Sequence, residues 1–437
     1  MQLVSTPVSG LNGHADIPGD KSISHRSLIF GAIAKGTTRV SGLLTGEDVL
    51  STAAALRQMG VKLEVDEAQK TAVIEGVGLN GLQEPKASLD MGNSGTSARL
   101  MMGLVAGQNI TARFIGDESL SKRPMKRISE PLSLMGAHLT SEAGDKMTLP
   151  MTVHGGNELK PIKYELPMPS AQVKSCLILA GLPLAGQTHI IEPVPTRDHS
   201  ENMLRAFGAD IRVEGTDIYL TGGTALKAQD IIVPGDPSSA AFMTVAALIT
   251  KGSDIMLENI GLSDRRAGLY ETLVEMGADI TFNNRRKVAG EPVADLRVRH
   301  SRLKGITVPP DRAPSMIDEY PVLFVAAAFA DGQTDMQGLH ELTVKESNRL
   351  TVMADGLRAC GADLTEGADF LIINGDGTAP MGGVQNIQTH HDHRIAMSFL
   401  VMGCGAQKPI GVADAGPIQT SFPNFISEMT KLGAQLA

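Results

Sequence analysis

Apolar residues along the chain follow a repeating pattern in which a helix-like segment ends at a glycine and a strand-like segment follows. The pattern is Leu-x-x-apolar-Gly-small-x-apolar, and a looser last copy begins with Met instead of Leu. A helix that ends at a glycine cap and turns into a strand accounts for this order of residues. The pattern therefore predicts six similar units. Their glycines are Gly60, Gly136, Gly208, Gly277, Gly361 and Gly433.

A second apolar segment, rich in small residues, lies upstream of each of these glycines. Runs as uniformly apolar as "DPSSAAFMTVAALI" are typical of helices that are buried on all sides. Strand-like pieces such as "TAVIEGV", "DIYLTGG" and "DFLIING" follow the glycines and indicate hairpins. Each unit therefore reads β-α-β-α-β-β, with a period of roughly 70 residues that exceeds those of common solenoid repeats.

The number of units predicts two domains, since 437 residues exceed one ordinary core. The last unit stops early, and the first residues of the chain have strand character, so we expect the N-terminal strand to complete it. The predicted domain A is 18–234, and domain B is 1–17 plus 235–437. Pro-Gly-Asp occurs at both crossings, at 18–20 and 234–236, which suits a hinge. We predict an α/β fold with three units around buried helices in each domain.

Composition narrows the class of protein. The net charge of −9 without a basic block makes nucleic acid a poor partner. No apolar run is long enough to span a membrane, and the first residues do not resemble a signal peptide. Three cysteines without CxxC spacing suit a reducing compartment. We expect a cytoplasmic protein with neither a nucleic-acid nor a membrane partner.

Reactive side chains gather at the starts of the predicted buried helices. Helix N-termini offer unpaired N–H groups and positive potential, so several in one cleft would hold anions. Ordinary capping explains the Ser and Asp residues, but cations at a positive helix end need an anion or a structural carboxylate. Asp20 before Lys21 rules out a Walker A loop. The residues are Lys21, Ser22, Arg26, the segment 92–99, the segment 170–174, Asp318, Glu319, His393 and Arg394.

Two further segments are rich in cations. "LSKRPMKR" (120–127) contains four, and "TVKESNRL" (343–350) is expected to place Lys345 and Arg349 on one helical face, with Glu346 between them. A solvated surface explains either segment taken alone. "THHDHR" (389–394) lacks a spaced carboxylate or thiol partner, so we predict no metal site there.

Taken together, the motifs "GDKSISHR", "GNSGT", "SAQVK", "IDEYP", "KESNRL" and "HHDHRIAMS" resemble the 5-enolpyruvylshikimate-3-phosphate synthase family over essentially the whole chain. The resemblance implies the enolpyruvyl transferase fold, an inside-out α/β barrel whose two domains close over the active site. It implies transfer of the enolpyruvyl group of phosphoenolpyruvate to the 5-hydroxyl of shikimate 3-phosphate, with release of phosphate. This step belongs to aromatic amino-acid and chorismate biosynthesis. The resemblance further implies a monomer, no cofactor or metal, and a target of glyphosate.

Site residues follow from the same resemblance. Asp318 is expected to be the base for the attacking hydroxyl, and Glu346 to exchange a proton with the methylene carbon. Lys21 neutralises charge on the bridging oxygen or acts as an acid, and the division of work between Lys21 and Glu346 stays open. Asn93 and Thr96 are expected to shape the tight turn that presents Gly95. The residues expected to bind shikimate 3-phosphate are Ser22, Arg26, Ser170, Gln172, Arg197 and Lys345. Ala171 and Asp318 are also expected to bind substrate. Those expected around phosphoenolpyruvate are Lys21, Gly95, Arg123, Gln172, Arg349 and Arg394.

The sequence departs from parts of the family pattern. Many members have a Lys before "TFP", and Thr420 stands at that position. "SAQVK" and "RDHSE" match the class II subgroup, but its Asn-x-Thr-Arg signature is replaced by "SDRR" (263–266).

Two alternatives remain open. One is the sister transferase that acts on UDP-N-acetylglucosamine and usually carries a reactive Cys on a loop, whereas Cys176 lies in an apolar helix. The other is an anion-binding relative without activity, against which Lys21, Asp318 and Glu346 argue together.

Overall fold

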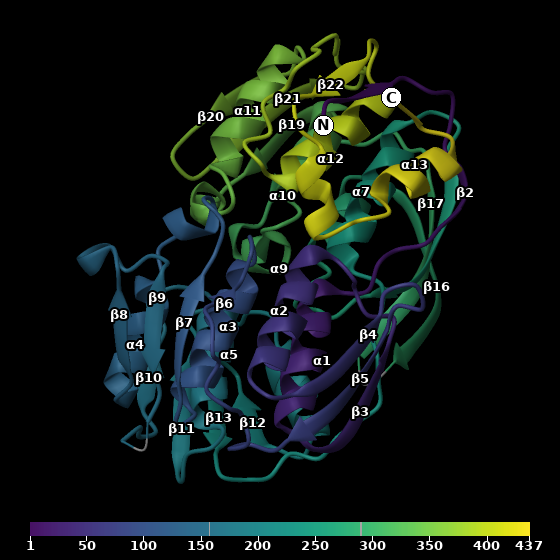
Figure 1. The fold of residues 1–437 in the computed structure, drawn as a ribbon. Coiled ribbons are helices and arrows are strands. Elements are labelled where there is room, and N and C mark those ends of the chain that lie inside the picture. Colours follow the sequence, from purple (N-terminus) through teal and green to yellow (C-terminus); the bar gives the residue numbers. More distant parts are fainter. Residues whose placement is uncertain (157, 289–290) are drawn as a thin grey trace. The chain divides into compact units, whose positions relative to one another are not determined.

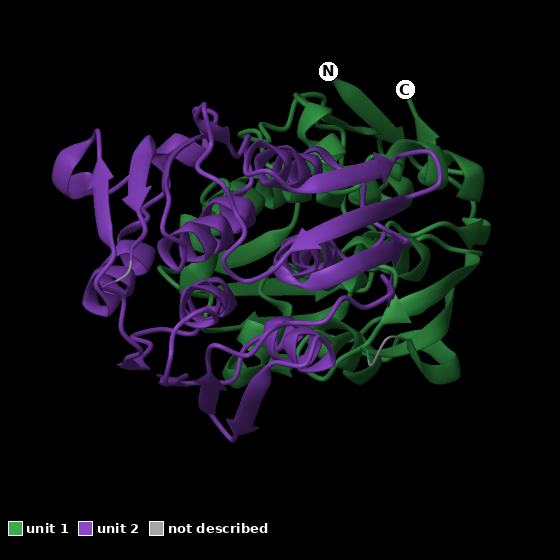
Figure 2. Cartoon of the chain, turned by 60° about the horizontal axis from the view of Figure 1, so that its bottom comes forward, with its two compact units in different colours: residues 1–18, 234–437 green, residues 19–233 purple. Residues whose placement is uncertain are grey.

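The chain forms two compact units in the computed structural model, which describes residues 1–156, 158–288 and 291–437. Unit 1 contains Met1–Pro18 and Pro234–Ala437, and unit 2 contains Gly19–Val233. Figure 2 shows the two units in different colours. Unit 2 is therefore inserted in sequence into unit 1. No helix within the described ranges combines the length and apolarity needed to cross a bilayer.

Unit 2 contains three β-α-β-α-β-β repeats, and the first repeat takes its first strand from the end of the unit (Figure 1). Repeat 1 contains β14 (Ile231–Ile232), α1 (Lys21–Ile33), β3 (Lys35–Ser41), α2 (Glu47–Gln58), β4 (Lys62–Asp66) and β5 (Thr71–Val77). Repeat 2 contains β6 (Leu89–Asp90), α3 (Gly95–Ala106), β7 (Thr111–Ile115), α4 (Lys126–Met135), β8 (His138–Ser141) and β9 (Met151–His154). Repeat 3 contains β10 (Lys163–Glu165), α5 (Ala171–Gly181), β11 (Gln187–Ile191), α6 (His199–Ala206), β12 (Asp210–Glu214) and β13 (Asp217–Thr221).

Unit 1 contains three more repeats, and strands from the N-terminal segment join two of them. Repeat 4 contains β2 (Asn12–Ala15), α7 (Pro237–Ile249), β15 (Asp254–Gly261), α8 (Gly268–Glu275), β16 (Asp279–Val288) and β17 (Glu291–Arg299). Repeat 5 contains β18 (Thr307–Val308), α9 (Ala313–Met316), α10 (Tyr320–Ala328), β19 (Asp331–Met336), α11 (Arg349–Ala359), β20 (Asp363–Glu366) and β21 (Leu371–Asp376). Repeat 6 contains α12 (His393–Gly405), β22 (Ile410–Val412), α13 (Phe425–Leu432), β23 (Gln435–Leu436) and β1 (Leu3–Thr6). Short 3-10 turns are η1 (Leu120–Lys122), η2 (Gly144–Lys146), η3 (Pro310–Arg312), η4 (His340–Val344) and η5 (Gly416–Thr420).

The five four-stranded sheets share one topology. The first strand lies parallel to the second, and the third and fourth form an antiparallel hairpin whose last strand returns beside the second. In the three-stranded sheet, β1 lies antiparallel to β22 and β23, with Leu3 opposite Val412 and Ser5 opposite Leu436. The described strands form separate sheets and no closed barrel. The predicted arrangement of repeats around buried helices is confirmed.

Each unit is built around the first helix of each of its repeats. Every residue of α7 and of α10 is buried, which fits their uniformly apolar sequences. Small residues let these helices approach closely. A Cβ on Gly103 of α3, for example, would lie 2.3 Å from the backbone oxygen of Cys176 in α5. Because the sides of these helices are covered by protein, their polar side chains are concentrated at their starts.

The glycine that closes each outer helix has a left-handed backbone. The φ angles of the six glycines of the sequence pattern lie between 87° and 109°. A side chain strains this conformation, and glycine does not. The glycine pattern therefore marks the helix ends, as predicted.

We expect Gly208→Ala to lower the free energy of unfolding by roughly 1–2 kcal/mol, because Gly208 has a φ of 87° and an added Cβ would have no heavy atom within 4 Å. Gly136→Ala should cost more, since its φ is 107° and its Cβ would lie 3.0 Å from the Glu158 carbonyl oxygen. Urea unfolding of the two variants measures both effects. Equal losses would show that the close contact adds nothing.

Candidate active site

The starts of α1, α3 and α5 lie together within unit 2. Each is capped by a side chain of the residue before it, namely Asp20, Ser94 and Ser170. Gln172 of α5 joins two of these starts. It donates to the Thr96 hydroxyl over 3.0 Å and accepts from Arg99 over 2.6 Å. The fold therefore brings the predicted residues 92–99 and 170–174 to one place.

Cations at the start of α1 are held by both charged and neutral groups. The Lys21 ammonium lies 3.0 Å from a carboxylate oxygen of Asp48. Arg26 is buried and donates to the hydroxyls of Ser200 and Ser175 at 2.7 Å. A structural carboxylate thus compensates Lys21, the simpler of the two explanations for a cation at a helix start.

His25, which lies between these cations in the sequence, is not itself a cation. Burial, aided by Lys21 and Arg26, lowers the pKa of His25 to about 3. Its Nδ1 and the Thr52 hydroxyl are 2.9 Å apart. His25 is therefore a neutral, hydrogen-bonded core residue.

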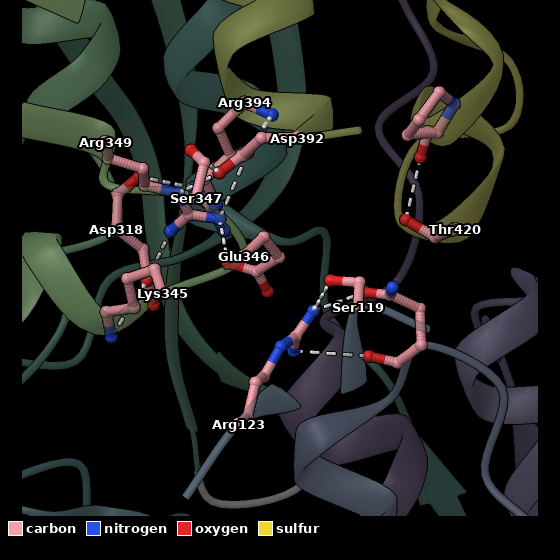
Figure 3. A network of polar contacts seen from close by, with 12 residues as sticks. Ser119, Arg123, Asp318, Lys345, Glu346, Ser347, Arg349, Asp392, Arg394 and Thr420 are labelled. Carbon is pink, nitrogen blue, oxygen red and sulfur yellow. Dashed lines mark hydrogen bonds and ion pairs between the residues drawn. The ribbon is translucent and has the colours of Figure 1, made fainter. Parts of the chain in front are cut away.

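Of the cations in 120–127, Arg123 is the one held in a network with predicted site residues. It is 8% exposed and donates to the Asn93 side-chain oxygen over 2.6 Å and to the Ser119 hydroxyl over 3.2 Å (Figure 3). Lys122 and Lys126 lie on the surface, in ion pairs with Glu118 and Glu130. The segment therefore combines a buried arginine with lysines on the solvated surface.

Gly95 is the first residue of α3, and a turn at Gly92 and Asn93, closed by the bond from the Ser94 N–H to the Met91 carbonyl oxygen over 2.9 Å, directly precedes it. In this turn Gly92 has a positive φ of 54°. A Cβ on Gly95 would lie 2.8 Å from the Arg99 Nη1 and 3.2 Å from the Arg123 Nη1. Glycine at position 95 therefore makes room for two guanidinium groups.

In unit 1, Arg349 is the centre of a carboxylate network. Its side chain is 1% exposed and donates to Asp392 over 2.8 Å and to Asp318 over 3.3 Å (Figure 3). It also donates to Glu346. Burial opposes the charge, but the carboxylates of Asp392, Glu346 and Asp318 outweigh it and raise the pKa of Arg349 above its usual range.

The expected helical face with Lys345 and Arg349 is wrong. The 3-10 turn η4 ends at Val344, Lys345 is extended, and α11 begins at Arg349. Asn348 caps α11 and so fixes its start. The two cations still share a partner, because the Lys345 ammonium lies 3.4 Å and the Arg349 guanidinium 3.3 Å from the Asp318 carboxylate.

Arg394 links the start of α12 to the start of α10. It donates to the Asp318 carbonyl oxygen over 2.6 Å and lies 3.5 Å from a Glu319 carboxylate oxygen. Here too a carboxylate compensates a cation at a helix start.

Sequence analysis missed the importance of Arg266. This buried residue contacts Asp236, the cap of α7, over 3.1 Å and the Ser238 hydroxyl over 2.7 Å. Ser238 in turn donates to Glu319. The only sequence signal for Arg266 is the "SDRR" segment (263–266). The sequence pattern places Asp236 in a predicted hinge and does not indicate that it caps α7.

A buried ion triad in unit 2 was also missed. The Lys174 ammonium lies 2.9 Å from Glu192 and 2.7 Å from Glu201, and all three side chains are at most 4% exposed. Glu192 also accepts from Thr196, next to the half-buried Arg197 in the loop before α6. The triad therefore braces this loop.

Two remaining predictions concern thiols and metals. Cys176, Cys360 and Cys404 are buried, and burial raises the pKa of each, to about 12 for Cys360 and about 11 for Cys404. Within the part of the chain that the structure describes, no three His, Cys, Asp or Glu side chains are grouped to hold a metal.

Thr420, which stands where many family members have a Lys, lies at the end of η5. Its hydroxyl donates to the Pro417 carbonyl oxygen over 2.8 Å (Figure 3).

Comparison with solved structures first defines the class of fold. The enolpyruvyl transferase NikO from Streptomyces tendae matches with a TM-score of 0.79 over 100% of this chain and 98% of its own, at 16% identity. The chain therefore has the enolpyruvyl transferase fold.

Closer relatives define the family. EPSP synthase from Acinetobacter baumannii matches with a TM-score of 0.88 and 48% identity over 100% of this chain and 99% of its own. Proteins named 3-phosphoshikimate 1-carboxyvinyltransferase from Parvibaculum lavamentivorans and Sphingopyxis alaskensis are each 57% identical, over 99% and 95% of this chain and 96% and 94% of their own lengths. The family model for EPSP synthase (3-phosphoshikimate 1-carboxyvinyltransferase) matches residues 5–429. The chain belongs to the EPSP synthase family.

We expect Glu201→Gln to flatten the pH dependence of stability. Burial raises the pKa of Glu201, with Lys174 only partly offsetting it, above the usual value of about 4.3. The folded protein then keeps a proton that the unfolded chain loses, so the stability from this group falls as pH rises through the folded pKa. Urea unfolding between pH 4 and 7 measures the slope. The exposed Glu165→Gln is the control, and a Glu201→Gln slope equal to that of the wild type would refute the assignment.

Proposed function

We propose that the helix-start clusters of units 1 and 2 together form the substrate site of an EPSP synthase, in a cleft between domains 18–234 and 1–17 plus 235–437. As a family member the chain is a transferase. It moves the enolpyruvyl group of phosphoenolpyruvate to the 5-hydroxyl of shikimate 3-phosphate and releases phosphate. The proposal includes a monomer in the cytoplasm that acts on these two small molecules, as a target of glyphosate.

The observation that carries the site proposal is the cluster around Arg349. Lys345 and Arg349 come from the segment 343–350, Arg394 comes from the start of α12, and all three converge on the Asp318 region. Both substrates carry phosphate and carboxylate groups, for which several cations in one place are the required chemistry.

The proposed binding set draws on both units. In unit 2, Gln172 is proposed to contact both substrates, and its bonds to Thr96 and Arg99 hold its side chain in place. Residues proposed to bind shikimate 3-phosphate are Ser22, Arg26, Ser170, Ala171, Gln172, Arg197, Asp318 and Lys345. Residues proposed around phosphoenolpyruvate are Lys21, Gly95, Arg123, Gln172, Arg349 and Arg394. Asn93 and Thr96 are proposed to shape the turn that presents Gly95.

The addition step needs a base and an acid. Asp318 accepts the proton of the 5-hydroxyl while that oxygen bonds to the central carbon of phosphoenolpyruvate. Lys345 and Arg349 beside it stabilise a negative charge, the form that accepts a proton. Glu346 gives a proton to the methylene carbon, which becomes a methyl group.

Elimination reverses the second proton transfer. Glu346 removes a proton from the new methyl group, the double bond re-forms, and the carbon–oxygen bond to phosphate breaks. Lys21 balances charge on the departing bridging oxygen. Because Arg349 bonds to both Glu346 and Asp318, it couples the position of the acid to that of the base.

The sister reaction on UDP-N-acetylglucosamine is not favoured. A thiol acting as a nucleophile or acid needs access and a low pKa. Cys176, Cys360 and Cys404 are buried with raised pKa values. Phosphate release from phosphoenolpyruvate, assayed with shikimate 3-phosphate, with UDP-N-acetylglucosamine and with neither, tests the assignment. Release with the sugar nucleotide alone would overturn it.

We expect Asp318→Asn to bind shikimate 3-phosphate but to lose turnover by on the order of 10²-fold or more, as loss of a general base should. Steady-state phosphate release gives kcat, and calorimetry gives the affinity. Asp311→Asn changes an exposed carboxylate in the same repeat and should keep its kcat. Turnover of Asp318→Asn near the wild-type value would mean that Asp318 only neutralises its cationic neighbours.

We expect Gly95→Ala to weaken glyphosate more than phosphoenolpyruvate, by about 10- to 200-fold in the inhibition constant. Its methyl group would crowd the guanidinium groups of Arg99 and Arg123, and a ligand longer than the substrate has less room to adapt. Gly156→Ala, whose Cβ would have no heavy atom within 4 Å, is the control. Equal changes in the inhibition constant and in the KM for phosphoenolpyruvate would show that position 95 does not discriminate.

A further inference from the structure

Unit 1 contains a cavity at the far ends of its central helices. It encloses about 260 Å³ and is lined by the last residue of α7, Ile249, by Phe329 after α10, and by Gly405 at the end of α12. The candidate site residues of unit 1 lie at the starts of the same helices. Since α7 and α12 have thirteen residues each, the two places are separated by about 20 Å along the helix axes.

Three basic side chains line this cavity, and they come from two separate segments. Lys251 follows α7, whereas His300 and Arg302 follow β17. No carboxylate within the described ranges lies in ion-pair distance of Lys251 or Arg302. A cluster of positive charges without a counter-charge favours an anion.

The pKa of His300 is consistent with this charge imbalance. Partial burial, together with the neighbouring Lys251 and Arg302, lowers the pKa of His300 below its usual value. The backbone N–H of His300 donates to the Ser253 carbonyl oxygen over 3.1 Å, so its place in the wall is fixed. An anion in the cavity would relieve the repulsion.

The remaining wall is largely apolar. Val8, Leu303 and Ala379 join Ile249 and Phe329 there. An inorganic ion would leave these apolar side chains in contact with water, whereas a ligand with an apolar body would remove them from it. Burial of apolar surface contributes roughly 25 cal/mol per Å².

The negative C-terminal end of a helix accounts for the position of only one of the three basic side chains. Lys251 lies just beyond the negative end of α7, where a cation is favourable without any ligand. His300 and Arg302 follow a strand and have no such reason to be there. Lys251 and Arg302 are exposed to solvent, and together with His300 they give the cavity mouth a local positive charge that an anion would complement.

We propose that this cavity is a second binding site, for a small carboxylate with an apolar body. Lys251 and Arg302 contact the carboxylate, and the apolar body lies against Ile249, Phe329 and Leu303. The cavity volume is at the lower end of ligand sites, which suits a small metabolite. The site is separate from the proposed active site, so it does not depend on the assigned reaction.

Benzoate, benzamide and inorganic phosphate test the proposal with the full chain. Methyl NMR of Ile249, Leu303 and Val8 reports binding at the cavity itself and so distinguishes it from binding at other cationic places. We expect saturable shifts at these methyl groups with benzoate, and affinities at least about 10-fold lower for benzamide, which lacks the charge, and for phosphate, which lacks the apolar body.

Variants separate the site from a general charge effect. Arg302→Gln should weaken benzoate about 5- to 10-fold, because it removes an exposed charged donor. Lys408→Gln removes an exposed cation of unit 1 outside the cavity and should leave the affinity unchanged. The proposal is overturned if benzoate leaves the three residues' methyl signals unshifted, if benzamide or phosphate binds as well as benzoate, or if Arg302→Gln and Lys408→Gln behave alike.

Discussion

A helix that is buried along its whole length can present chemistry only at its ends, and this constraint governs both units. The sides of the central helices do not contact solvent, because sheets and outer helices cover them. Their two ends, with the side chains beside them, are what is left to meet a ligand. Six repeats therefore supply six helix starts, and the chemistry of the chain is concentrated on residues that cap or follow them, from Ser94 to Arg394.

Both units hold cations with carboxylates, as Asp48 holds Lys21 in unit 2 and Asp392 holds Arg349 in unit 1, and unit 2 adds neutral partners. In unit 2, Arg26 and Arg99 have neutral partners such as hydroxyls and an amide. In unit 1, Arg349 and Arg394 have carboxylates within reach. Neutral partners leave more positive charge for an anionic ligand, whereas carboxylates fix geometry and supply proton acceptors. Groups positioned in this way need little rearrangement when charge develops in a reaction.

Local signals made much of this predictable. Each glycine cap, each uniformly apolar helix and each capping Ser or Asp acts within a few residues, so the repeats and the starts of α1, α3, α5 and α12 could be inferred. Long-range pairs could not. Lys174 contacts Glu192 and Glu201 only in the folded chain, and Arg266 contacts Asp236, which lies thirty residues earlier in the same repeat. The prediction of one helix through Lys345 and Arg349 was wrong for a local reason, because Asn348 caps a new helix that begins at Arg349.

Insertion of unit 2 into unit 1 has a consequence for the order of folding during synthesis. Strand β1 leaves the ribosome before all of unit 2, whereas its partners β22 and β23 are made after all of unit 2. Unit 2 is contiguous from Gly19 to Val233, so its three repeats can close while the rest is still being made. Until residue 436 appears, the N-terminal strand has an unpaired edge, and such edges invite aggregation. The nascent chain therefore has to carry the short strand β1 unpaired until β22 and β23 have been synthesised.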